Sequence, residues 1–279
     1  MSPVVRHVRA PGTGALFVSR VLVRHFVLPV LLTVVWSAAG FAYSCPPDRI
    51  DETVQVAYVN DGDTVALADG RKLRIVGINT PELGFTGASP EAFATEARDA
   101  LWALLASRRE IGLRFDQQQK DRYGRVLAHV FLENGVSLTA QLLEQGYGSA
   151  LTVLPNLWNA ECYRAAEREA RTRQRGIWVL PAYQHTDAAA VDLDASGYKI
   201  LQGRVSRWVV RGGATYLYLD GKVVLRIHGD DAGYFDPRIF QRGSGYCQGR
   251  KIEVRGWLHR YKDHLYMRIR HPAALTILE

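Results

Sequence analysis

The chain has 279 residues, of which 47% are hydrophobic and 23% charged, and its formal net charge is +7. This composition is ordinary for a folded globular protein and excludes a low-complexity or disordered chain. Its length allows one large or two small domains with ample core material. The three cysteines show no CxxC pair and no Cys/His spacing suited to zinc, which argues against a zinc-finger type of protein.

The first 44 residues have the layout of a secretory signal. They contain four arginines and no acidic residue, followed by an apolar run at 26–40 and then the small residues Gly40, Ala42 and Ser44. This order predicts export, with cleavage near 42–44 and a periplasmic or secreted location. The apolar run is short for a membrane span. An uncleaved leader that anchors the chain remains an alternative, and only in that case is membrane association expected.

Apolar spacing predicts, in chain order, strands at 65–67 and 73–75, a helix at 90–105, strands at 110–116 and 126–132, and helices at 137–145 and about 157–174. Asp69-Gly70 suits the turn between the first two strands. Ser89 is the expected N-cap of the first helix, with Pro90 at its first position. Residues 181–197 lack apolar periodicity and are expected to form a linker.

The last part of the chain is expected to be a small β-barrel. Five strands are predicted at 199–210, 215–220, 222–228, 250–261 and 264–270, with a short helix near 232–240.

Net charge also distinguishes the first part of the chain from this last part. Residues 45–196 hold 16 Lys/Arg and 21 Asp/Glu, a net of −5, whereas residues 197–279 hold 15 and 7, a net of +8. We therefore expect a leader at 1–44, a first domain at 45–180, the linker and a basic second domain at 198–279. The basic domain either approaches polyanions or has a merely solvated basic surface.

Chemically useful side chains gather at the predicted strand ends of the first domain: Asp61, Asp63, Arg74, Asn79, Thr80 and Glu82, followed by Asp121, Tyr123 and Arg125. Carboxylate, amide and main-chain oxygens suit a hard cation such as Ca²⁺. Two arginines suit the oxygens of a phosphodiester, and a glutamate near them can take a proton from water. Each residue alone is equally well explained by a turn or by a surface ion pair of little energetic value. Together they indicate phosphodiester hydrolysis.

The motif DGDT, then Arg74, then the motifs INTPE and DRYGR, in this order, resemble the thermonuclease family, the secreted Ca²⁺-dependent nucleases typified by staphylococcal nuclease. The resemblance spans roughly residues 53–179 and includes LLEQGYG and AEREARTRQRGIW. It implies a mainly β fold with helices (α+β), in which a five-stranded OB-type barrel carries three helices. The second domain is expected to be a further small OB-like β-barrel.

The resemblance also implies roles for individual residues. The expected catalytic residues are Arg74, Glu82 and Arg125. The expected Ca²⁺ site has Asp63, Asn79 and Thr80, with Asp61 in support. Arg122 and Tyr123 are expected to bind substrate.

Two features depart from the family pattern. Asn79 stands where the best-known members have a second aspartate, so the cation should bind more weakly. Leu151 and Val153 stand near where tyrosines would stack on a base, so nucleotide affinity or preference is expected to differ.

In the second domain, aromatic and basic residues are interleaved as in OB barrels that hold single strands. The candidates for substrate contacts are Trp208, Arg255 and Trp257, together with Arg207, Tyr218, Arg260 and Tyr261. Inward-facing members of such a set belong to the core, because side chains alternate between the faces of a strand. The domain is therefore expected to hold substrate or to dock on an envelope component.

Export would place the cysteines in an oxidising compartment, where two of the three can pair. We expect a Cys45–Cys162 disulfide, because it would tie the mature N-terminus to a helix of the same domain, and a free Cys247.

The sequence thus predicts an exported Ca²⁺-dependent nuclease that hydrolyses DNA and/or RNA, preferably single-stranded, by in-line attack of water, with no obligatory protein partner. One alternative is a weak or inactive module of the same fold that binds nucleic acid or an envelope partner. A second is a structural envelope protein held by its leader.

Overall fold

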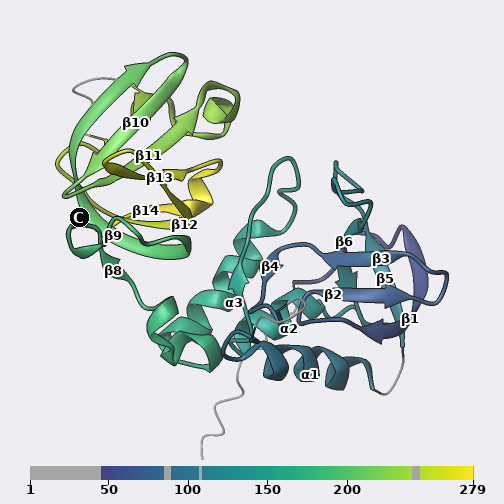
Figure 1. Cartoon of the computed structure of the whole chain (residues 1–279). Coiled ribbons are helices and arrows are strands. Elements are labelled where there is room, and N and C mark those ends of the chain that lie inside the picture. Colours follow the sequence, from purple (N-terminus) through teal and green to yellow (C-terminus); the bar gives the residue numbers. More distant parts are fainter. Residues whose placement is uncertain (1–44, 85–88, 107–108, 241–245, 279) are drawn as a thin grey trace, which may run out of the picture. The chain divides into compact units, whose positions relative to one another are not determined.

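The computed structural model describes residues 45–84, 89–106, 109–240 and 246–278, which all belong to one compact unit. The predicted leader at 1–44 lies outside the described residues. Two closed β-barrels follow one another along the chain (Figure 1), which confirms the expected fold class. Among the described residues, no helix is long and apolar enough to span a membrane.

The first barrel closes in the strand order β1-β2-β3-β6-β5. Its strands are β1 (Glu52–Val59), β2 (Thr64–Leu67), β3 (Lys72–Ile75), β5 (Glu110–Arg114) and β6 (Val126–Phe131). Strands β3 and β6 are parallel, whereas the other pairs are antiparallel. The predicted hairpin is confirmed, with Gly70 at φ 89° in its turn. Alternate strand residues, such as Leu73 and Ile75, fill the interior.

Three helices accompany this barrel: α1 (Ala94–Leu105), α2 (Leu138–Glu144) and α3 (Ala160–Thr172). Helix α2 begins as predicted, because the Ser137 hydroxyl accepts a hydrogen bond from the Ala140 amide at 3.3 Å. After it, Gly146 has φ 81°, and a Cβ there would lie 2.3 Å from the carbonyl oxygen of Arg175. Glycine is therefore required at this helix end both by conformation and by close packing. A short pair, β4 (Ile78–Asn79) with β7 (Ser149–Ala150), completes this part.

The predicted starts of two helices are wrong. Helix α1 begins at Ala94 after Phe93, which is in the left-handed region at φ 69°, and not at Pro90 after Ser89. The reason is a tertiary contact: the Glu91 amide donates to the carbonyl of Glu82 at 2.9 Å, which holds this segment as a loop. Helix α3 likewise begins only at Ala160.

The second barrel closes in the order β9-β10-β11-β13-β12, with β12 paired back to β9. Its strands are β9 (Gly197–Arg211), β10 (Ala214–Leu219), β11 (Val223–His228), β12 (Lys251–Tyr261) and β13 (His264–Arg268), with β8 (Thr186–Asp187) and β14 (Leu275–Ile277) added to the sheet. Strands β11 and β13 are parallel. Strand order and direction therefore repeat those of the first barrel, which is the connectivity of OB folds. Short 3-10 helices lie at Gly176–Val179, Pro181–Tyr183, Ala188–Ala190, Gly229–Tyr234, Pro237–Phe240 and Pro272–Ala274.

Part of the predicted linker at 181–197 is built into this barrel. Strand β8 pairs in parallel with β9, and the side chain of Ala188 is 1% exposed in the barrel core. Apolar periodicity could not reveal these residues, because the ordered pieces are only two or three residues long.

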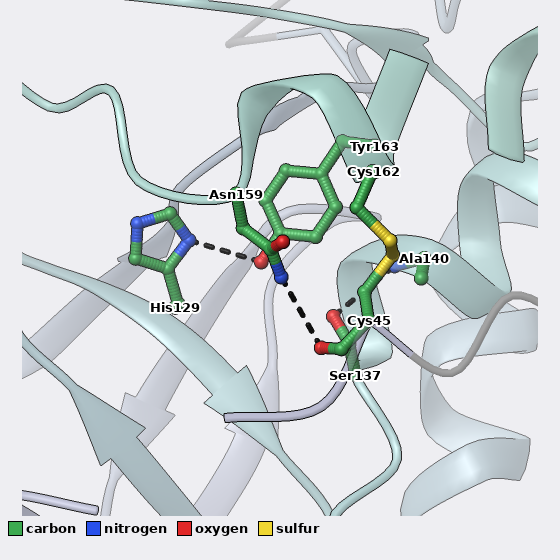
Figure 2. The surroundings of a disulfide bond; sticks show 7 residues. All are labelled: Cys45, His129, Ser137, Ala140, Asn159, Cys162 and Tyr163. Atoms are coloured by element: carbon green, nitrogen blue, oxygen red, sulfur yellow. Dashed lines mark hydrogen bonds between the residues drawn. A yellow bond between two sulfur atoms is a disulfide. The ribbon is translucent and has the colours of Figure 1, made fainter. Parts of the chain in front are cut away.

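The predicted disulfide is present between Cys45 and Cys162, across 117 residues of sequence. Figure 2 shows it beside Asn159, whose side-chain amide donates to the Cys45 carbonyl at 3.2 Å. The first described residue is thus fixed to helix α3 by a covalent and a hydrogen bond. Cys247 is free and buried, and burial raises the pKa of its thiol to about 11.

His129 on β6 is buried against helix α3, where its Nδ1 lies 3.0 Å from the Tyr163 hydroxyl (Figure 2). Burial lowers the pKa of His129 to about 4, although Asp116 opposes this shift. The unfolded chain therefore takes up this proton first as the pH falls below about 6.5. We expect the free energy of unfolding to drop by about 3 kcal/mol between pH 6.5 and 4 through this residue.

Urea unfolding across this pH range checks the expectation. Because other groups also titrate, the relevant quantity is the difference between the wild type and His129→Gln, which keeps a hydrogen-bonding side chain but does not titrate. A pH dependence that is the same in both proteins would contradict the role of His129.

Candidate active site

The two acids of the DGD motif lie in the loop between β1 and β2. The Asp63 side chain is buried; its carboxylate accepts hydrogen bonds from the Thr64 hydroxyl at 3.0 Å and from the Thr80 amide at 3.1 Å. Asp61 accepts a hydrogen bond from the Asp63 amide at 3.0 Å. A glycine is needed between them because the Thr80 side chain packs closely against this position: a Cβ on Gly62 would lie 2.8 Å from it. This explains why a glycine separates the two acids.

Arg74 on β3 reaches the same buried carboxylate. Its Nη2 lies 2.9 Å from Asp63 Oδ2 and donates to the Ile78 carbonyl at 2.8 Å. The pairing of β2 with β3 explains why the Asp63 and Arg74 side chains lie together, because Thr64, next to Asp63, lies opposite Arg74 in the register. An arginine with a largely buried, oriented guanidinium is pre-organised to bind an anion at this edge of the barrel.

Glu82 follows the short strand β4 and Thr80-Pro81. Partial desolvation and the negative charge of Asp63 raise the pKa of its carboxyl, whereas the charges of Arg74 and Arg125 lower it. The geometry agrees, because the Thr80 amide, two residues before Glu82, donates to the Asp63 carboxylate that pairs with Arg74. A carboxylate with a raised pKa is a better proton acceptor near neutral pH.

Arg125 is held by the DRYGR turn between β5 and β6. Its Nε donates to Asp121 at 2.7 Å, and Asp121 also accepts from the main-chain amides of Tyr123 and Arg125, both at 2.9 Å. Burial raises the pKa of Asp121, but these hydrogen bonds outweigh it and the pKa is lowered. Arg122 donates to the hydroxyl of Tyr123 at 2.6 Å. Tyr123 is 69% exposed, and the guanidinium groups of Arg122 and Arg125 lie 4.8 and 5.7 Å from the centroid of its ring.

The oxygen-bearing residues fit a hard cation. Burial, together with the charges of Asp63 and Glu82, raises the pKa of Asp61 to about 6. Negative charge is thus concentrated here, and a bound cation would offset it. Among the described residues, no three His, Cys, Asp or Glu side chains form a metal cluster. Amide and main-chain oxygens would therefore have to complete the site, and Asn79 and Thr80 offer both kinds.

The three second-barrel candidates have different surroundings. Arg255 Nη1 is 2.7 Å from both carboxylate oxygens of Glu167, whose side chain is 2% exposed. Trp208 donates its indole N–H to the Ile239 carbonyl at 2.7 Å and packs on the barrel core. Trp257 is 52% exposed and contacts Tyr198 edge to face. Of these three, only Trp257 presents an open ring surface.

Sequence reasoning missed two supporting residues. Glu91 accepts a hydrogen bond from the Glu82 amide at 2.9 Å and so fixes the position of the candidate base. No sequence signal marks Glu91, because the apolar spacing places it inside the predicted helix at 90–105. Ala97 on α1 lies against the Gly62 position, and it shows that this helix supports the acidic loop.

Comparisons with known proteins point to one family. The family model for staphylococcal nuclease homologues matches residues 72–179. The thermonuclease of Staphylococcus hyicus is 32% identical over 131 residues, covering 46% of this chain and 76% of the relative. The thermonuclease of Staphylococcus intermedius is 30% identical over 130 residues, with 46% and 76% covered. An uncharacterized endonuclease of Escherichia coli is 28% identical over 141 residues, with 50% and 84% covered.

A five-stranded OB barrel that brings two arginines, a glutamate and paired aspartates to one edge defines a hydrolase of the nuclease class. More particularly, the chain belongs to the staphylococcal nuclease family. The family match ends at residue 179, before the second barrel.

Proposed function

We propose that this chain is an exported, Ca²⁺-dependent nuclease that hydrolyses phosphodiester bonds in single-stranded DNA or RNA. The observation that carries the proposal is the contact of Asp63 with Arg74 at 2.9 Å and with the Thr80 amide at 3.1 Å, two residues before Glu82. We further propose the division into a leader at 1–44, a nuclease domain at 45–180, a connection at 181–197 and a second domain at 198–279.

In the proposed reaction, Glu82 accepts a proton from the water that attacks phosphorus in line with the leaving oxygen. Arg74 and Arg125 bind the non-bridging oxygens, which gain negative charge as the water adds. Arg125 also stabilises the leaving oxygen, and Tyr123 and Arg122 contact a neighbouring phosphate. Ca²⁺, held by Asp63, Asn79 and Thr80 with Asp61 in support, would supply further stabilisation of that charge.

The disulfide supports the proposal of export. Stable disulfides form in oxidising compartments such as the periplasm or the cell exterior, and Cys45 lies directly after the predicted cleavage region at 42–44. Sequencing the N-terminus of the mature protein from cell fractions tests the proposal. A chain recovered from the membrane with its leader intact would support the anchored alternative.

Calcium dependence is tested by cleavage of denatured DNA in Ca²⁺ and in EGTA, with calorimetric titration of Ca²⁺ as a readout independent of activity. Because an amide replaces a carboxylate at position 79, we expect Asn79→Asp to bind Ca²⁺ about tenfold more tightly, since ligand charge strongly tunes Ca²⁺ affinity. Asn134→Asp, in an exposed turn, is the matched control and should leave the affinity unchanged.

The alternative is a module of the same fold that binds nucleic acid with little or no turnover. The observation that favours it is Asn79, which removes one negative charge from the proposed cation site. If the wild type retains DNA in a salt-sensitive way but cleaves it at no Ca²⁺ concentration, the binding module replaces the nuclease.

A further inference from the structure

The outer face of the second barrel carries a cluster of aromatic and basic side chains that the proposed reaction does not use. Its members are Arg207 on β9, Tyr216 and Tyr218 on β10, Arg226 on β11, and His264 and Tyr266 on β13. We call this surface the tyrosine face (Figure 1 shows the strands). These side chains point outward because alternate residues of the same strands, such as Leu217, Leu225 and Leu265, fill the barrel core.

The strand register places Tyr216 opposite Arg226 and aligns three other members in one row across the sheet. The row is Arg207, Tyr218, Val224, Tyr266 and His259, each opposite the next on the neighbouring strand. Val224 is fully buried although it points outward, because the neighbouring tyrosine rings flank it on both sides. The rings therefore form a continuous surface in place of separate exposed side chains.

Contacts within the face orient the rings and their cations. The Arg207 guanidinium lies 3.8 Å from the centroid of the Tyr218 ring, and that of Arg226 lies 5.8 Å from Tyr216. His264 makes ring contacts with both Tyr218 and Tyr266, at 6.1 and 6.4 Å between centroids. Such cation–π and edge contacts hold side chains in fixed positions before any ligand arrives.

Two arginines of the tyrosine face carry positive charge without a matching acid. Their neighbour Arg268 on β13 is instead paired with Asp231 at 2.8 Å. Among the described residues, neither Arg207 nor Arg226 has a carboxylate within salt-bridge distance, and the buried Nε of Arg226 has no hydrogen-bond acceptor. None of the outward positions of β10 and β11 is occupied by Asp or Glu. Guanidinium groups without a carboxylate partner are the natural partners for the phosphates of an anionic ligand.

We propose that the tyrosine face binds single-stranded nucleic acid, with bases stacked on the tyrosine rings and phosphates held by Arg207 and Arg226. Stacking requires bases that are free of a duplex, so a single strand fits and a duplex does not. Strands 2 and 3 of OB barrels, here β10 and β11, form the surface that such ligands use. The proposal rests on the proposed function, in that nucleic acid is the substrate.

The face holds a strand and does not cut it. In the first barrel, Asp63 and Arg74 meet at the start of the β2–β3 pair. At the corresponding end of the β10–β11 pair, Ala214 lies opposite His228, so the pairing of an acid with an arginine is not repeated. The second barrel would therefore raise the local concentration of long substrates near the catalytic barrel.

The test measures binding without cleavage. The Glu82→Gln chain in EGTA is titrated against a fluorescein-labelled oligothymidylate of about 15 nucleotides, and anisotropy gives the Kd. We expect Tyr218→Ala and Tyr266→Ala each to weaken binding about tenfold, because one base loses its stacking partner. Tyr266→Leu keeps Val224 covered but lacks the aromatic face, so it should weaken binding even if the alanine variant unfolds. Arg226→Met should weaken binding and make it less sensitive to salt between about 50 and 200 mM NaCl.

Matched controls are Tyr58→Ala, an exposed tyrosine of β1, and Arg98→Met on α1, which is ion-paired with Asp99. Both should bind as the parent chain does. Equal binding by parent and tyrosine-face variants would overturn the proposal, as would no binding at all. Equal affinity for duplex DNA or for labelled dextran sulfate would also overturn it, in favour of a general polyanion surface.

The binding assay does not depend on cleavage. If the wild type cannot cut DNA in Ca²⁺ but the variants lose binding, this inference stands and the proposed nuclease activity fails. The opposite pair of results would overturn the tyrosine face and leave the nuclease site intact.

Discussion

Replacing Glu82 with glutamine is expected to lower the rate of DNA cleavage by about 10²–10⁴-fold. Glutamine has nearly the same size but cannot accept the proton from the attacking water. The carboxyl is suited to this role because partial desolvation and Asp63 raise its pKa, while Arg74 and Arg125 limit the rise. The measurement is the initial rate on denatured DNA at saturating Ca²⁺.

Glu96→Gln provides the matched control for this substitution, since Glu96 is an exposed glutamate on α1 outside the site. It should cleave at the wild-type rate. Binding of the oligonucleotide by Glu82→Gln should remain, because the change removes a proton acceptor and not a phosphate contact. A Glu82→Gln chain with more than about a tenth of the wild-type rate would exclude Glu82 as the general base.

Loss of the disulfide is expected to cost about 2–5 kcal/mol of unfolding free energy. The bond closes a long loop, with 117 residues separating Cys45 and Cys162, and its removal gives the unfolded chain many more conformations. The double variant Cys45→Ser/Cys162→Ser and the reduced wild type should show the same loss in urea unfolding.

Reduction itself supplies the control. Dithiothreitol should destabilise the wild type but leave the double variant unchanged, because the remaining Cys247 is unpaired. If the double variant unfolds within about 0.5 kcal/mol of the oxidised wild type, the bridge contributes little and the hydrogen bond from Asn159 to Cys45 suffices to hold the N-terminus.

Local patterns predicted those parts of the fold whose physics is local. The Asp69-Gly70 turn, the helix that follows Ser137 and the alternation of the second-barrel strands all depend on neighbours within a few residues, and all appear as expected. The predicted start of α1 at Pro90 was wrong, because the contact between Glu91 and Glu82 overrides the local preference for a helix there.

The chemistry of the first site was also visible in the order of its residues. Asp63, Arg74 and Glu82 could be named because their motifs follow one another at the ends of predicted strands, and β2–β3 pairing alone brings Asp63 and Arg74 together. Supporting contacts such as Gly62 against Thr80 required the folded chain, because they join segments that no local pattern connects.

The second barrel shows the opposite case. Composition predicted a basic, aromatic barrel but could not divide its residues by role. Only the tertiary structure places Arg255 against the buried Glu167 and turns the indole of Trp208 toward the Ile239 carbonyl.

The sequence by itself therefore determined the fold class and the order of the elements in the first barrel, because short-range pairing and motif order carry that information. It favoured the Cys45–Cys162 disulfide without excluding the other pairings, and the structure decided between them. The tertiary structure alone decided which arginines are neutralised and which tyrosines lie side by side. Ion pairing and stacking depend on strand register and on contacts across more than 80 residues of chain, such as Glu167 with Arg255, and a linear pattern does not contain those distances.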